Sequence, residues 1–140
     1  MNKLVLILGV VVAALAIYGV FTLSADKNES ADQSNLNWNT DLNSALSTAQ
    51  NTNKLVLVDF YAPWCTYCRQ MDAVTFQDPR VQQKLSSNYV LVKINGDQNP
   101  DLVKKYQVYG YPTILILDSS GNVVKTMSGY QGPDEFLNMI

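Results

Sequence analysis

The sequence contains no histidine among its 140 residues. This absence removes the commonest general base and the commonest metal ligand in proteins. Any chemistry must therefore use cysteine, carboxylate, lysine or tyrosine side chains. The chain also lacks a basic run, and its formal net charge of -2 argues against nucleic acid as a partner. Apolar residues make up 47% and charged residues 16%, a balance typical of a globular protein.

Cysteine is also scarce, because the only two thiols are Cys65 and Cys68 in the segment FYAPWCTYCRQ (60–70). As a structural disulfide the pair would contribute little, because stabilisation grows with the length of the closed loop. As a zinc site it would supply half of the ligands, and only a dimer sharing the metal would complete it. Haem attachment would need histidine after Cys68, where Arg69 stands. The remaining interpretation is a redox centre.

One long apolar run is present at the N-terminus, where residues 4–23 carry no charge. A helix of that length spans roughly 30 Å, about one bilayer core. The apolar part of a cleaved signal peptide is shorter, about 7–15 residues. We therefore expect residues 1–23 to form an uncleaved transmembrane helix, with a signal peptide as the alternative. Lys3 and the amino terminus precede the run, and Asp26, Lys27 and Glu29 follow it, which predicts that the rest of the chain lies outside the cytoplasm.

The remainder divides into a polar tether and one domain. Residues 24–36 (SADKNESADQSNL) are polar and predict a flexible linker. The domain is expected to occupy residues 37–140, beginning with a helix capped by Asn39 or Thr40. Near-continuous apolar runs at 55–62 and 89–95 predict strands covered on both faces. Further expected elements are helices at 65–74, 79–85 and 100–106, strands at 113–117 and 123–127, and a helix from Pro133 onward.

This alternation of strands and helices predicts an α/β domain with a mixed central sheet flanked by helices. Cys65 follows the first strand and opens a helix, whose N-terminus stabilises a thiolate. Cys68 lies one turn further on, within reach of a mixed disulfide at Cys65. Asp59 and Lys93 interrupt the two apolar strands. A buried carboxylate has a raised pKa and can take a proton from Cys68, so both charged residues are candidate catalytic groups.

Two segments carry a family resemblance. VDFYAPWCTYC (58–68) resembles the active-site segment of thioredoxins, and KINGDQNPDLVKKYQVYGYPTILIL (93–117) resembles the stretch leading into their cis-proline strand. The resemblance covers about residues 54–140. It implies a thioredoxin fold, with Cys65 as the attacking thiol and Cys68 as the resolving thiol. It also implies a buried aspartate at Asp59, a neighbouring lysine at Lys93, and no cofactor beyond the Cys65–Cys68 disulfide.

The same resemblance implies a set of substrate-binding residues. Trp64 matches the tryptophan before the first cysteine, and Pro112 matches the cis-proline that faces the thiols. Tyr111 and Thr113 flank that proline. A cis bond there would expose backbone beside Cys65, where a strand of the substrate could pair.

The sequence departs from thioredoxins in two places. Thr66-Tyr67 replaces Gly-Pro between the cysteines, and Tyr111 is bulkier than the aliphatic residue usual before the cis-proline. The stretch RQMDAVTFQDPRVQQKL (69–85) is instead similar to the C-terminal thioredoxin-like domain of membrane disulfide-interchange reductases of the DsbD type. This similarity favours a dedicated extracytoplasmic partner over general thioredoxin activity.

The predicted function is therefore a membrane-tethered thiol–disulfide oxidoreductase on the extracytoplasmic side, periplasmic or at the cell surface, that reduces disulfides of substrate proteins. Cytosolic thioredoxin cannot reach across the bilayer. The resemblance thus implies a membrane-embedded electron donor of the DsbD or CcdA type.

Three alternatives stay open. The first is a disulfide-forming oxidase or isomerase, which the reduction potential would distinguish. The second is a non-catalytic metal-handling protein, which metal content would reveal. The third is a module that binds unfolded chains, an activity that would survive mutation of both cysteines.

Overall fold

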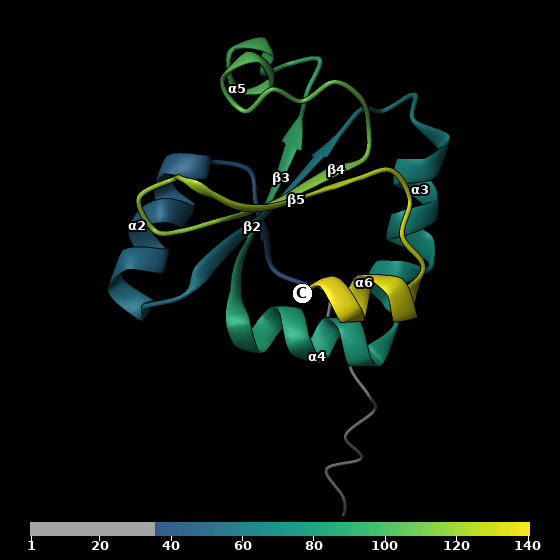
Figure 1. The fold of residues 1–140 in the computed structure, drawn as a ribbon, viewed down its shortest axis with the longest axis horizontal. Helices are drawn as coiled ribbons and strands as arrows, with labels where there is room; N and C mark the ends of the chain where they lie inside the picture. Colours follow the sequence, from purple (N-terminus) through teal and green to yellow (C-terminus); the bar gives the residue numbers. More distant parts are fainter. Residues whose placement is uncertain (1–35) are drawn as a thin grey trace, which may run out of the picture. The chain divides into compact units, whose positions relative to one another are not determined.

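The computed structural model describes residues 36–140 (Figure 1). The predicted membrane helix at 1–23 and all but the last residue of the predicted linker lie outside this range, so both stay predictions. None of the helices described between residues 36 and 140 combines the length and the apolar composition of a membrane span.

A five-stranded mixed sheet forms the centre of the domain, in the order β1-β3-β2-β4-β5. The strands are β1 (Trp38–Asn39), β2 (Leu55–Tyr61), β3 (Tyr89–Asn95), β4 (Thr113–Leu117) and β5 (Val123–Ser128). β3 runs parallel to both β1 and β2, whereas β4 is antiparallel to β2 and β5. The predicted mixed sheet is confirmed, and β1 is an addition that the sequence pattern did not indicate.

Five α-helices and one 3-10 helix connect or flank the strands in the described range. They are α2 (Leu42–Thr52), α3 (Thr66–Ala73), η1 (Thr75–Gln77), α4 (Pro79–Asn88), α5 (Pro100–Lys105) and α6 (Pro133–Met139). The predicted cap of the first helix was wrong. Asp41 caps α2, and its carboxylate accepts hydrogen bonds from the backbone N–H groups of Asn43 and Ser44. Asn39 cannot serve, because it is already paired with β3 as part of β1.

The helix predicted to end at Leu85 continues to Asn88. Residues 86–88 are polar and contain neither glycine nor proline, so nothing local stops the helix before β3 begins at Tyr89. The hydroxyl of Ser86 also donates to the carbonyl of Gln82 one turn earlier, which satisfies the side chain within the helix.

Alternate residues of β2 face two separate hydrophobic cores, as the strand period requires. Val56, Val58 and Phe60 pack with residues of α2 on one face of the sheet, while Leu57 packs with residues of α3, α4 and α6 on the other. Figure 1 shows α2 on one side of the sheet and α3, α4 and α6 on the opposite side. β2 is thus covered on both faces, as its apolar run predicted, and Asp59 lies within that cover.

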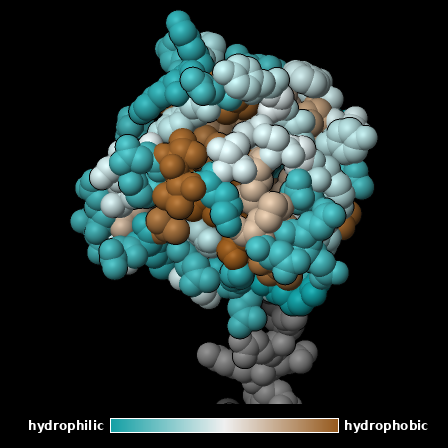
Figure 2. Space-filling view, viewed as in Figure 1, coloured by the Kyte–Doolittle hydropathy of each residue, from teal (hydrophilic) through white to brown (hydrophobic). Residues whose placement is uncertain are grey.

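The β5 edge of the sheet carries an exposed apolar patch. Val123 and Val124 of this strand are exposed, and Figure 2 shows apolar side chains gathered on the face where β5 lies. Lys125 follows them, and a bulge interrupts the pairing of β4 with β5 at the same point. A central lysine and a bulge are devices that discourage pairing with another chain.

Candidate active site

The two cysteines are joined in a disulfide where β2 passes into α3. Cys65 is the N-cap of α3, and its sulfur accepts a hydrogen bond from the backbone N–H of Cys68, with an N–S distance of 3.1 Å. Arg69 donates to the carbonyl of Pro63 at 2.9 Å and so braces the loop before Cys65. The helix N-terminus directs its partial positive charge at this sulfur, which favours the thiolate once the bond is reduced.

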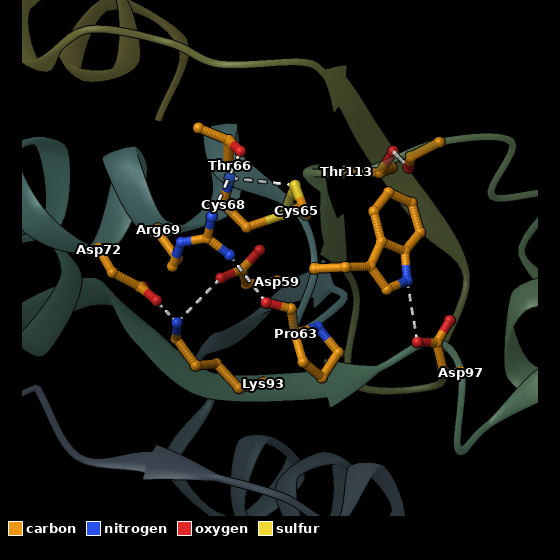
Figure 3. The surroundings of a disulfide bond; sticks show 12 residues. Asp59, Pro63, Cys65, Thr66, Cys68, Arg69, Asp72, Lys93, Asp97 and Thr113 are labelled. Carbon is orange, nitrogen blue, oxygen red and sulfur yellow. Dashed lines mark hydrogen bonds and ion pairs between the residues drawn. A yellow bond between two sulfur atoms is a disulfide. The ribbon is translucent and has the colours of Figure 1, made fainter.

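A chain of three charged side chains lies in the surroundings of the disulfide (Figure 3). The register of β2 and β3 sets Asp59 directly opposite Lys93. The Lys93 Nζ lies 3.3 Å from the Asp59 Oδ2 and forms a second ion pair with the Asp72 Oδ1. Asp59 is only 2% exposed, whereas the Lys93 side chain keeps 20% exposure and the Asp72 side chain 46%. The three charged side chains therefore extend from the core, at Asp59, to the solvent, at Asp72.

Burial is the main influence on the Asp59 carboxyl, and it raises the pKa from 3.8 to about 6. The positive charge of Lys93 opposes this rise, and the negative charge of Asp72 adds to it. The Asp59 Oδ1 is buried without a hydrogen-bond partner among the described residues. A carboxyl with this pKa is mostly ionised at neutral pH and can accept a proton there.

Trp64 stands beside the disulfide, held by two contacts. Its indole Nε1 donates to the Asp97 Oδ2 at 3.0 Å, and its ring meets the Tyr111 ring edge-on at 5.9 Å between centroids. The Trp64 side chain is nevertheless exposed. An exposed aromatic side chain in a fixed position offers an apolar contact surface at low entropic cost.

The loop that faces the cysteines contains a cis peptide bond between Tyr111 and Pro112, as the resemblance implied. Tyr111 packs against the cluster of Ala62, Cys65 and Cys68. Gly96 makes room for it, because a Cβ atom there would overlap the tyrosine ring. Burial, and then the charge of Asp97, raise the pKa of the Tyr111 phenol.

Thr113 begins β4 immediately after this loop and pairs with Phe60 of β2. Its side chain is buried, and its hydroxyl donates to the carbonyl of Gly110 at 2.8 Å. Thr113 thus has the geometry of a residue that holds the loop in place.

A groove of about 330 Å³ adjoins the cis-proline loop. Its lining comes from the segment before the loop, the loop itself and the end of β5: Gln107, Tyr109, Gly110, Tyr111, Pro112, Thr113, Thr126, Ser128 and Gly129. Tyr109, one of these lining residues, is 92% exposed. Among residues 36–140, no three His, Cys, Asp or Glu side chains gather closely enough to hold a metal ion.

Comparison with protein families identifies the family of this domain. The family model described as a thioredoxin-like domain matches residues 42–140, which include the disulfide, both charged strand residues and the cis-proline. The chain belongs to the thioredoxin-like family. This thioredoxin-like domain accordingly has the fold and the Cys-X-X-Cys pair of the thiol–disulfide oxidoreductases.

Curated relatives of the domain are much longer proteins. It is 44% identical over 78 residues to the thiol:disulfide interchange protein DsbD of Photorhabdus laumondii, a match covering 54% of this chain and 14% of that protein. It is 35% identical over 98 residues to the DsbD of Haemophilus influenzae, covering 66% of this chain and 17% of that protein. The chain therefore spans about one sixth or less of the length of these relatives.

Solved structures with the same fold include a thioredoxin and the C-terminal domain of a DsbD. The solution structure of a thioredoxin from Thermus thermophilus matches with a TM-score of 0.67 and 29% identity, covering 74% of this chain and 83% of that one. The oxidised C-terminal domain of DsbD from Neisseria meningitidis matches with a TM-score of 0.63 and 28% identity, covering 74% of this chain and 96% of that one.

Every site residue proposed from the sequence lies in the neighbourhood of the disulfide or of the loop facing it, but two contacts were missed. Asp72 follows Cys68 by four positions on α3, so the i,i+4 spacing places both on one face of the helix and was a usable signal. Asp97 lies just past the end of β3, and β3 runs parallel to β2 and ends at the same edge. No local pattern pairs Asp97 with Trp64.

Proposed function

We propose that this chain is a thiol–disulfide oxidoreductase that is tethered to the membrane, lies outside the cytoplasm and reduces disulfides in substrate proteins. The observation that carries the proposal is the Cys65–Cys68 disulfide at the N-terminus of α3, with a buried carboxyl of raised pKa at Asp59 in its surroundings. An acceptor for the proton of the second thiol is what a two-step exchange needs.

In the first step, the Cys65 thiolate attacks one sulfur of a substrate disulfide. A bond forms between Cys65 and that sulfur, and the other substrate sulfur leaves as a thiolate. In the second step, Cys68 gives its proton to the Asp59 carboxylate and attacks the Cys65 sulfur. The second substrate sulfur leaves as a thiolate, and the domain carries the Cys65–Cys68 disulfide. One substrate thiolate takes up the proton held by Asp59 and the other takes one from water, which gives two thiols. Two electrons have passed from the domain to the substrate.

Lys93 is assigned a supporting role in the second step. Its ammonium lies 3.3 Å from the Asp59 carboxylate and lowers the pKa that burial has raised. Without this positive charge, the pKa of Asp59 would rise further, and less of the carboxyl would be ionised at neutral pH to accept the Cys68 proton. Lys93 therefore acts through Asp59, by favouring the ionised carboxylate, and does not contact the substrate.

The substrate is proposed to lie in the groove beside the cis-proline loop. Pro112 and Tyr111 line the groove next to Cys65, and an extended segment of substrate can pair with the exposed backbone there. Trp64 adds an exposed aromatic ring that packs against Tyr111, and the Thr113 hydroxyl holds the loop through its hydrogen bond to Gly110. The tyrosine between the cysteines, Tyr67, is also exposed, and its ring lies 6.5 Å from that of Tyr130 between centroids.

The reducing direction draws on similarity to proteins named thiol:disulfide interchange protein DsbD. A reductant outside the cytoplasm meets oxidising conditions and must be recharged. A membrane-embedded electron donor of the DsbD or CcdA type would deliver electrons to the Cys65–Cys68 disulfide. Anchoring by residues 1–23 would keep the domain near that donor and raise its effective concentration there.

One labelling experiment tests location and direction together. Protoplasts of cells that make the full-length chain are treated with a charged maleimide that does not cross the cytoplasmic membrane. We expect labelling of the membrane-bound chain without added reductant, because the cysteines lie outside and are held as thiols. The chain has only these two cysteines, so the labelled sites are unambiguous.

Two controls separate the outcomes. Labelling that occurs only after treatment with a reductant would contradict the reducing direction and favour the oxidase or isomerase. Absence of labelling until the membrane is permeabilised would contradict the extracytoplasmic location. Recovery of the labelled chain in the soluble fraction would identify residues 1–23 as a cleaved signal peptide and leave the exchange chemistry intact.

A further inference from the structure

The ammonium of Lys93 is enclosed by three aromatic rings. Its Nζ lies 5.3 Å from the centroid of the Trp38 ring, 5.3 Å from that of Tyr61 and 5.6 Å from that of Phe76. We propose that Trp38 is a positioning residue of the redox centre, which holds Lys93 against Asp59 through this aromatic cage of Trp38, Tyr61 and Phe76. The assignment to the resolving step rests on the proposed function.

The cage is assembled from three separate elements, β1, β2 and η1. Trp38 comes from the two-residue strand that pairs with β3, at Leu91. It meets Phe76 edge-on at 5.1 Å between ring centroids, so the two rings fix each other. A cation within about 6 Å of a ring centroid is attracted to the ring face, and the attraction grows when water is excluded. Each ring in the cage meets that distance.

Trp38 covers part of the Lys93 side chain, which keeps only 20% exposure. A cleft of about 270 Å³ opens here, lined by Leu36, Trp38, Asp72, Phe76, Gln77 and Lys93. The charged or titratable groups that face Lys93 are Asp59 and Tyr61 from β2 and Asp72 from α3. Asp72 lies on the solvent side and competes with Asp59 for the ammonium. Removal of the Trp38 ring would let Lys93 keep its pair with Asp72 while moving away from Asp59 toward water.

The consequence falls on Asp59. Lys93 is the positive charge that favours the ionised form of this buried carboxyl. If Lys93 spends more time turned away, Asp59 binds its proton more tightly and stays protonated to a higher pH. The Cys68 thiol would then lose its acceptor at the lower end of the neutral range. The first strand of the domain thus influences the proton affinity at the redox centre without touching the cysteines.

The test reads Asp59 directly, by following its carboxyl carbon with NMR in the oxidised full-length chain as the pH is raised. Trp38→Leu and Trp38→Met both remove the ring face and keep apolar bulk. We expect either variant to raise the titration midpoint of Asp59 by about half a pH unit, given the usual strength of a cation–ring contact. Trp38→Phe retains a ring and should leave the midpoint close to that of the unmodified chain.

Two further variants isolate the mechanism. Lys105→Met removes another cation–ring pair, in which the ammonium lies 5.1 Å over Tyr106 away from the disulfide, and should leave Asp59 unchanged. In a chain that already carries Lys93→Met, Trp38→Leu should have no additional effect. An unmoved midpoint in folded Trp38→Leu or Trp38→Met would overturn the inference, as would an effect of equal size without Lys93.

This readout is independent of the proposed function, because it needs no substrate and no catalysed exchange. A chain that lacks oxidoreductase activity but shows the displaced midpoint would contradict the proposed function and keep the cage. A chain that exchanges disulfides normally, but whose Asp59 midpoint does not move when Trp38 is replaced, would contradict the cage and keep the proposed function.

Discussion

Replacement of Cys65 with serine is expected to lower the rate of disulfide reduction on the order of a thousandfold or more, because a hydroxyl cannot replace a thiolate as the attacking group. Cys65 is the N-cap of α3, so its sulfur lies at the positive end of the helix dipole. The measurement is the rate at which the full-length chain, supplied with excess dithiol, reduces a disulfide-bonded protein. The rate should fall to that of the dithiol alone.

Cys68→Ser is the matched variant, because it removes the other thiol from the same helix. It should still attack the substrate through Cys65 but lack the group that resolves the mixed disulfide. A covalent complex that a reductant releases is therefore expected to accumulate on a non-reducing gel. If Cys65→Ser accumulates that complex and Cys68→Ser does not, the two roles are reversed.

Asp59→Asn is expected to stabilise the domain at pH 8 by about 3 kcal/mol and to have little effect near pH 4. The folded-state pKa of Asp59 is about 6 and its ordinary value is 3.8. Between these values the folded chain binds a proton that the unfolded chain does not, so the free energy of unfolding falls as pH rises through about 6. Each pH unit in that window corresponds to about 1.4 kcal/mol.

Denaturant unfolding of the oxidised chain from pH 4 to pH 8 measures this difference. Asp72→Asn is the control, because it removes a half-exposed carboxylate from the same cluster and should leave most of the pH dependence in place. Parallel stability profiles for Asp59→Asn and the unmodified chain would show that Asp59 does not titrate as described.

The same Asp59→Asn variant should slow the resolution of mixed disulfides at neutral pH by about a hundredfold, which is the usual contribution of a positioned general base. Stability and activity then move in opposite directions at one residue. A buried carboxyl that destabilises the fold and accelerates a reaction is a common feature of functional sites.

Much of this fold was predictable because its strands are apolar on both faces. The runs at 55–62 and 89–95 could only be central strands, and a charge within them had to be unusual. Asp59 therefore stood out from the sequence alone. Its exact partner did not, because the register between parallel strands depends on the intervening helices. The pairing with Lys93 was anticipated through the resemblance and is present in the structure.

The features that were missed have a common physical origin. β1 has two residues, too few to show a period, and it exists because β3 supplies a partner for it. Its position also decided the cap of α2, since Asn39 was already used in the strand. Trp38 and Asp97 reach the site only through contacts between segments distant in the sequence. Such contacts leave no local signature, even where each element is predicted correctly.

The reduction potential of the Cys65–Cys68 pair tests the central claim most directly. The full-length chain is equilibrated with buffers of known dithiol and disulfide ratio, and the reduced fraction is read by alkylation and mass. The account predicts one reversible two-electron transition near the potential of thioredoxin, about -270 mV. A potential near the strongly oxidising value of about -120 mV, or a disulfide that does not exchange reversibly, would contradict the reductase account.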